Sequence, residues 1–170
     1  MITRFRLILC LALGVPGFFP LQAAEVRTFT SRTAAELRAR FAGRPFLLAF
    51  WSISCEPCRA ELALLTRLHR EFPAVPVILV AADGPQHQAA VERFLGREDW
   101  GAIERWQFGD ESEERLRFSV DPAWRGELPR AVFHDAAHAP TAHSGVPDEA
   151  VARAWFSAAQ RAAAQGTSQR

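Results

Sequence analysis

The sequence predicts a single α/β domain with a mixed sheet. Two apolar runs of strand length, 46–51 ("FLLAFW") and 75–82 ("VPVILVAA"), flank a segment with helical periodicity. Continuous apolar runs are typical of strands buried on both faces, and a helix between two such strands implies that the strands are parallel. Two later segments, 130–135 and 141–144, predict an antiparallel pair.

The other elements follow from local patterns. A short strand is predicted at 26–29 and a helix at 33–42, which Gly43 and Pro45 end. The helix between the two apolar runs carries its apolar residues at helical spacing, at Leu62, Leu65, Leu68 and Phe72.

The second half is less regular. Pro85, at a first-turn position, predicts a helix to about residue 95, and 111–118 is expected to form a short helix. The tryptophan-rich stretch 96–110 is predicted to be irregular. Pro147, Asp148 and Glu149 predict the start of the last helix, because acidic residues suit its positive end.

The N-terminus resembles a bacterial secretory signal. Arg4 and Arg6 precede an apolar run at 7–13, and small residues at 22–24 suit a signal peptidase. The prediction is therefore a signal peptide at 1–24, a domain at 25–170 and a periplasmic location. An uncleaved segment that tethers the chain to the inner membrane is the alternative, and a lipid attached at Cys10 is less favoured because Leu9 precedes it.

Removal of the signal leaves two cysteines, Cys55 and Cys58, in a chain whose full-length net charge is only +1. This near neutrality gives no indication of a nucleic-acid partner. An exported chain reaches an oxidising space, where a lone pair of cysteines can form a disulfide.

The pair lies in "SCEPC", where a buried strand runs into a helix. The free N–H groups and the positive end of the helix dipole both favour a thiolate, which is the reactive species in disulfide exchange. Cys55 is the expected nucleophile, since it lies at the exposed helix end. Cys58, one turn further in, is expected to resolve the mixed disulfide.

Other interpretations of the pair remain open. A copper- or zinc-binding carrier would use Cys55, Cys58 and one of three histidines near the predicted hairpin, His134, His138 and His143. No second cysteine pair is present to complete a structural zinc site. A structural disulfide is disfavoured because so small a loop removes little entropy from the unfolded chain. A non-catalytic binding module is the third alternative.

The stretch 47–72, "LLAFWSISCEPCRAELALLTRLHREF", resembles the active-site segment of TlpA/ResA-like thiol-disulfide oxidoreductases of the thioredoxin superfamily. "GELPRAVFHD" (126–135) resembles the family's Gly-x-x-Pro run, and "HSGVPDEAV" (143–151) its approach to the last helix. The resemblance implies a thioredoxin-like fold, with helices on both faces of a central mixed sheet. It also implies a Cys55–Cys58 redox-active disulfide that works without a bound cofactor or metal.

The same resemblance assigns further site residues. It makes Glu61 an active-site acid, for which the alternative is an ordinary surface carboxylate. The substrate-binding residues that it implies are Trp51, Ser54, Glu56, Pro57, Leu128 and Pro129, with a cis bond before Pro129. Two departures stand out: Ser54 takes the place of the family's tryptophan, and Ala49 that of the buried aspartate of thioredoxins.

The partners are expectations from the family. A reductase of protein disulfides needs electrons from a membrane thiol-transfer protein, and cytochrome c maturation is one of the family's tasks. The chain is expected to act as a monomer.

Overall fold

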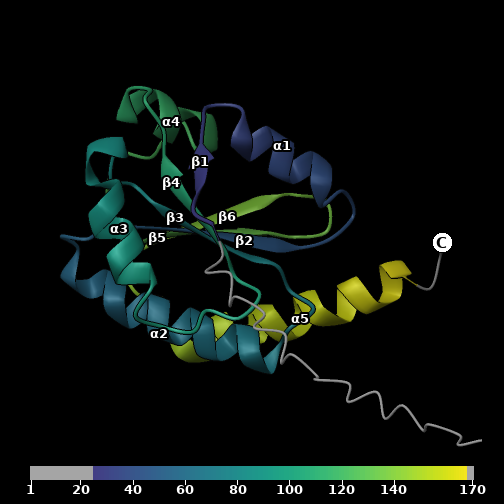
Figure 1. Ribbon diagram of the computed structural model, residues 1–170. Helices are drawn as coiled ribbons and strands as arrows, with labels where there is room; N and C mark the ends of the chain where they lie inside the picture. The colour runs from purple at the N-terminus through teal and green to yellow at the C-terminus, as the bar shows by residue number, and fades with distance from the viewer. Residues whose placement is uncertain (1–24, 168–170) are drawn as a thin grey trace, which may run out of the picture.

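The computed structural model describes residues 25–167, in which a sheet lies between two groups of helices (Figure 1). The strands are β1 (Arg27–Phe29), β2 (Phe46–Trp51), β3 (Val77–Ala81), β4 (Glu104–Phe108), β5 (Arg130–His134) and β6 (Pro140–Ser144). The helices are α1 (Thr33–Arg40), α2 (Glu56–Glu71), the 3₁₀ turn η1 (Pro85–His87), α3 (Gln88–Leu95), α4 (Glu113–Val120) and α5 (Glu149–Thr167). The expected signal segment lies outside the described residues.

The sheet is mixed, as predicted. Its strand order is β1-β4-β3-β2-β5-β6. The pairs β1·β4, β4·β3 and β3·β2 are parallel, whereas β2·β5 and β5·β6 are antiparallel. The two apolar runs form the central strands β2 and β3, every residue of which is buried.

The prediction of an irregular stretch at 96–110 is wrong for its second half, because β4 lies there, between β1 and β3. Its first residues are charged and only partly buried. Glu104 forms ion pairs with Arg27 of β1 and with Arg40 at the end of α1, at 3.0 and 2.6 Å. The start of this interior strand thus carries charged residues, which an apolar strand pattern does not predict.

The two faces of the sheet carry separate cores, because side chains alternate along each strand. Leu47, Ala49 and Trp51 of β2 face α2, α3 and α5, whereas Phe46, Leu48 and Phe50 face α1 and α4. Figure 1 shows the same division, with α2 and α5 along one side of the sheet and α1 and α4 along the other. Helices on both faces confirm the expected architecture.

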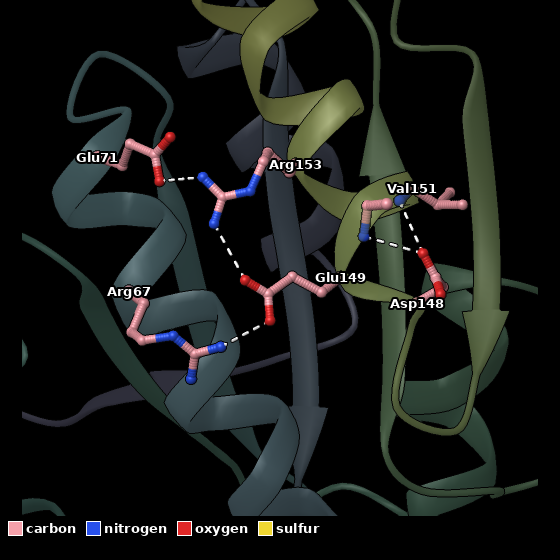
Figure 2. A network of polar contacts seen from close by, with 7 residues as sticks. Arg67, Glu71, Asp148, Glu149, Val151 and Arg153 are labelled. Carbon is pink, nitrogen blue, oxygen red and sulfur yellow. Dashed lines mark hydrogen bonds and ion pairs between the residues drawn. The ribbon is translucent and has the colours of Figure 1, made fainter.

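An ion-pair network joins α2 to α5 (Figure 2). Arg153 of α5 lies between Glu71 of α2 and Glu149, and Glu149 also accepts from Arg67 at 3.0 Å. Asp148 caps α5 by accepting from two backbone N–H groups, one of them that of Val151 at 3.1 Å. A network holds helices better than isolated exposed pairs, which contribute about 0–1 kcal/mol each. It fixes α2, the helix that begins with the cysteines.

Candidate active site

The site lies where β2 ends and α2 begins. The backbone N–H of Ala82, just after β3, donates to the carbonyl of Trp51 at 2.7 Å, so the ends of the two parallel strands are tied together. Cys55 occupies the N-cap of α2, and its N–H donates to Ser52 O at 3.2 Å. This tight connection places the first cysteine at the free N–H groups of the helix.

Cys55 and Cys58 form a disulfide. Cys55 is partly exposed, whereas Cys58 is only 1% exposed and belongs to the core beneath α2. The two sulfurs therefore differ in access, as the sequence predicts. Only Cys55 can meet a partner thiol or disulfide without movement of the core.

Glu61 is the most unusual residue of the site. It is 0% exposed, and neither carboxylate oxygen has a hydrogen-bond partner among the described residues. Burial raises its pKa from 4.5 to about 8. The alternative of a surface carboxylate is therefore wrong: Glu61 lies on the buried stripe of α2, one turn after Cys58.

The peptide bond between Leu128 and Pro129 is cis, as predicted. Arg130 pairs with Phe50, so Pro129 lies beside the end of β2 that leads to Cys55. Leu128 is partly exposed and packs against the core cluster that contains both cysteines. Leu128 and Ser54, the residue before Cys55, line one cavity. The substrate-binding roles of Leu128 and Pro129 stay predictions.

The remaining predicted binding residues surround the pair. Ser54, Glu56 and Pro57 are exposed, and the hydroxyl oxygens of Ser54 and Ser52 lie 3.0 Å apart. Trp51 is instead buried and packs on Phe94, with ring centroids 4.6 Å apart. Trp51 therefore lies beneath the site. The substrate-binding roles of Trp51, Ser54, Glu56 and Pro57 stay predictions.

Sequence reasoning missed Asp83. Its Oδ2 accepts from the N–H of Ile53 at 3.0 Å, which fixes the segment ahead of Cys55. Burial raises the pKa of Asp83, while the hydrogen bond from Ile53 acts in the opposite direction. A signal was present, since Asp83 lies two residues after β3 and the carboxyl ends of parallel strands are where α/β proteins build sites.

The histidines proposed as metal ligands lie elsewhere. His134 pairs with Phe46 at the opposite end of β2 from the cysteines, and the Nε2 of His138 lies 3.1 Å from Phe41 O. His143 sits on the exposed edge strand β6. These histidines do not join the cysteines in one site, and residues 25–167 contain no metal-binding cluster of three acidic, histidine or cysteine side chains.

Within that same range, no helix has the length and apolarity needed to cross a bilayer.

Known structures resemble most of the described domain. A secreted disulfide oxidoreductase of Mycobacterium tuberculosis, homologous to E. coli DsbE, matches with 20% identity and a TM-score of 0.55, over 71% of this chain and 85% of that chain. A thioredoxin-family thiol:disulfide interchange protein of Chlorobium tepidum matches with 16% identity and a TM-score of 0.57, over 72% and 84%. StoA of Bacillus subtilis matches with 18% identity and a TM-score of 0.52, over 67% and 83%.

The protein has a thioredoxin-like fold. This confirms the fold that the sequence resemblance implies. No protein-family model matches the sequence, and no curated protein matches it either. At 16–20% identity the likeness establishes the fold, so the activity has to be argued from the residues of the site.

Proposed function

We propose that the protein is an exported thiol-disulfide oxidoreductase that reduces protein disulfides. The observation that carries the proposal is the Cys55–Cys58 disulfide at the start of α2, with the buried carboxyl of Glu61 one turn behind it. Similar structures include a disulfide oxidoreductase and a thiol-disulfide isomerase, which supports the proposal at the level of the fold. An uncharged, unpartnered carboxyl in a core is destabilising, and such groups are typical of functional sites.

The reaction follows from the different exposure of the two sulfurs. In the reduced protein, the thiolate of Cys55 attacks a sulfur of the substrate disulfide. A Cys55–substrate disulfide forms, the substrate disulfide breaks, and the first substrate sulfur leaves as a thiolate that takes up a proton. Cys58 then attacks the sulfur of Cys55 and releases the second substrate thiol. Two electrons pass from the cysteine pair to the substrate. The Cys58 proton passes to Glu61, and the two substrate thiolates take up their protons from water.

Glu61 moves the proton of Cys58. The Cys58 thiol must lose its proton before it attacks. The ionised form of Glu61, a minority at pH 7, is the buried base that shares its helix face. A carboxylate with a pKa of about 8 is well matched to a thiol, whose ordinary pKa is about 8.5. At pH 7 the oxidised protein keeps that proton on Glu61. When a donor thiolate reopens the disulfide at Cys55, Glu61 returns the proton to the departing Cys58.

The charges around the pair favour the reducing direction. The helix N-terminus stabilises a thiolate at Cys55, but the carboxylate of Glu56 in the first turn opposes it. Above about pH 8, where Glu61 is ionised, its carboxylate adds a second opposing charge. A less stabilised thiolate makes the reduced form less favoured and the protein a stronger reductant.

The cellular setting that we propose is periplasmic. The secretory pattern of residues 1–24 supports export, and a secreted protein is among the similar structures. Electrons would come from a membrane thiol-transfer protein, and the cysteine pair of an apocytochrome c is a suitable substrate. Both assignments rest on the family resemblance of the cysteine segment.

Reduction of insulin disulfides with dithiothreitol as donor tests the activity. Cys55→Ser should abolish catalysis, whereas Cys58→Ser should lose turnover but retain a mixed disulfide with insulin that is visible on a non-reducing gel. Ser157→Ala, on α5, is the matched control and should keep turnover. Insulin reduction by Cys55→Ser at the wild-type rate would overturn the proposal.

A further inference from the structure

A polar cavity of about 220 Å³ opens beside the cysteine pair, and we call it the Asp83 pocket. The fold brings four segments to it: the stretch before Cys55, the loop after β3, the helix α4 and the approach to Pro129. Its lining residues include Ser52, Ser54, Asp83, Glu113, Arg117 and Leu128. Cavities for drug-sized ligands measure roughly 300–1,000 Å³, so this one suits a single side chain.

Asp83 provides the unbalanced charge of this pocket. One carboxylate oxygen accepts from the Ile53 N–H, and none of the arginines described forms an ion pair with Asp83. Arg117 is held by two carboxylates, Glu113 at 3.0 Å and Glu114 at 3.5 Å. Glu113 and His87 are the other titratable groups that act on Asp83, and they do so with opposite signs. The pocket is therefore acidic at neutral pH.

Two residues that line the pocket are neighbours in the sequence of residues that the proposed reaction uses. Ser54 directly precedes Cys55, and Leu128 directly precedes the cis-proline. Ser54 is small, whereas the family that the segment resembles carries a tryptophan there. An indole at this position would add bulk to a wall that the serine leaves open. The pocket is thus a feature of this chain's own residues.

We propose that the Asp83 pocket binds a lysine or arginine side chain that lies near the reacting cysteine of the substrate. The inference rests on the proposed function and specifies its substrate class. A substrate segment that runs along Leu128 and presents a sulfur to Cys55 carries its neighbouring side chains past the mouth of the pocket. A cationic end there meets the carboxylate of Asp83, and the two serine hydroxyls supply further acceptors.

The test uses symmetric disulfide dimers of capped nine-residue peptides, each with a central cysteine. Lysine, norleucine or glutamate is placed at each of the two positions on either side of the cysteine. Prereduced protein is mixed with each dimer, quenched with an alkylating reagent and analysed by mass spectrometry. One protein dithiol and one peptide disulfide give one protein disulfide and two peptide thiols.

At one or more positions, the lysine dimer should react about tenfold faster than the norleucine dimer, a ratio equivalent to about 1.4 kcal/mol. This advantage should shrink as salt is added, because the charges lie at the surface. Asp83→Asn keeps an oxygen that accepts from Ile53 N–H but removes the charge. It should bring the ratio of the lysine rate to the norleucine rate to about one.

Glu114→Gln is the matched control. It removes one negative charge from the carboxylates around Arg117, but Glu114 does not line the pocket. It should keep the preference for lysine. Equal rates for lysine and norleucine at every position, or a preference that survives Asp83→Asn, would refute the pocket and leave the reductase proposal intact. Failure of the wild-type protein to reduce any dimer would refute both.

Discussion

The buried carboxyl of Glu61 should make the oxidised protein less stable as the pH rises, and Glu61→Gln should remove this effect. In the unfolded chain a glutamate has its ordinary pKa of 4.5, whereas in the folded protein the pKa of Glu61 is about 8. Between these values folding requires a proton to be taken up. The stabilising contribution is therefore fully present below pH 4.5 and is lost as the pH rises to 8.

The magnitude follows from the pKa difference. One pKa unit corresponds to about 1.36 kcal/mol, so the loss from Glu61 amounts to about 3 kcal/mol at pH 7 and about 5 kcal/mol above pH 8. Glutamine has nearly the same shape and cannot ionise. Its amide is a different buried polar group and shifts the free energy of unfolding by a constant amount. The evidence therefore lies in how the difference between the two proteins changes with pH.

Urea unfolding of the oxidised proteins, followed by tryptophan fluorescence at pH 5, 7 and 8.5, measures this difference. The free energy of unfolding of Glu61→Gln minus that of the wild type should be larger at pH 8.5 than at pH 5, by about 3 kcal/mol or more. Glu56→Gln is the matched control, because Glu56 lies on the same helix with a side chain that is 87% exposed. It should leave the pH dependence unchanged. Parallel curves for the wild type and Glu61→Gln would show that the buried carboxyl is not perturbed.

Three further predictions follow. In the reduced protein, iodoacetamide should modify Cys55 well before Cys58, because Cys58 is only 1% exposed. Equal modification rates of the two thiols, measured by mass spectrometry, would contradict the assignment of Cys55 as the nucleophile. At pH 8.5, where Glu61 is ionised, Glu61→Gln should make the couple more oxidising in equilibrium with glutathione, by about 30 mV for each 1.4 kcal/mol of added stability in the reduced form. An unchanged potential at that pH would remove Glu61 from the redox chemistry. Burial lowers the pKa of His134 to about 4, so stability should fall by about 3 kcal/mol as the pH drops from 6.5 to 4. His134→Phe, which keeps a ring to stack on Phe46, should reduce that loss in urea unfolding at the two pH values, and an equal loss would place the acid sensitivity elsewhere.

The central part of the fold could be predicted from the sequence because its signal is local and strong. Apolar runs such as 46–51 belong to strands buried on both faces, and the structure confirms this for β2 and β3. The strand β4 gives no such signal. Its sequence, "ERWQF", mixes charged, aromatic and amide side chains, because Glu104 at its start serves ion pairs with Arg27 and Arg40. The partners of Glu104 lie more than 60 residues away in the sequence, so a local sequence pattern does not predict these ion pairs.

The site was predictable to a similar extent. Cys55, Cys58 and the cis bond before Pro129 follow from spacing and resemblance, and the structure bears out their positions. The burial of Glu61 could not be decided from the sequence, since a carboxylate next to an apolar stripe of a helix more often faces solvent. Asp83 was missed because its contact with Ile53 joins two loops that are 30 residues apart.

The position of the acid has a physical consequence for the proposed reaction. Ala49, on β2, is 0% exposed in the same core cluster as Cys58. By the resemblance of the cysteine segment, it corresponds to the position of the buried aspartate of thioredoxins. A carboxyl on that strand would reach the thiol across the gap between sheet and helix, so its distance would depend on how α2 packs. Glu61 instead shares α2 with Cys58 at a separation of three residues, where Cβ atoms lie about 5–6 Å apart. The base and the thiol that it serves then keep their spacing even if the segment before Cys55 moves when the disulfide opens. The loss of a strand acid at Ala49 is therefore compatible with proton transfer, because the helix supplies an acid whose position depends on the helix alone.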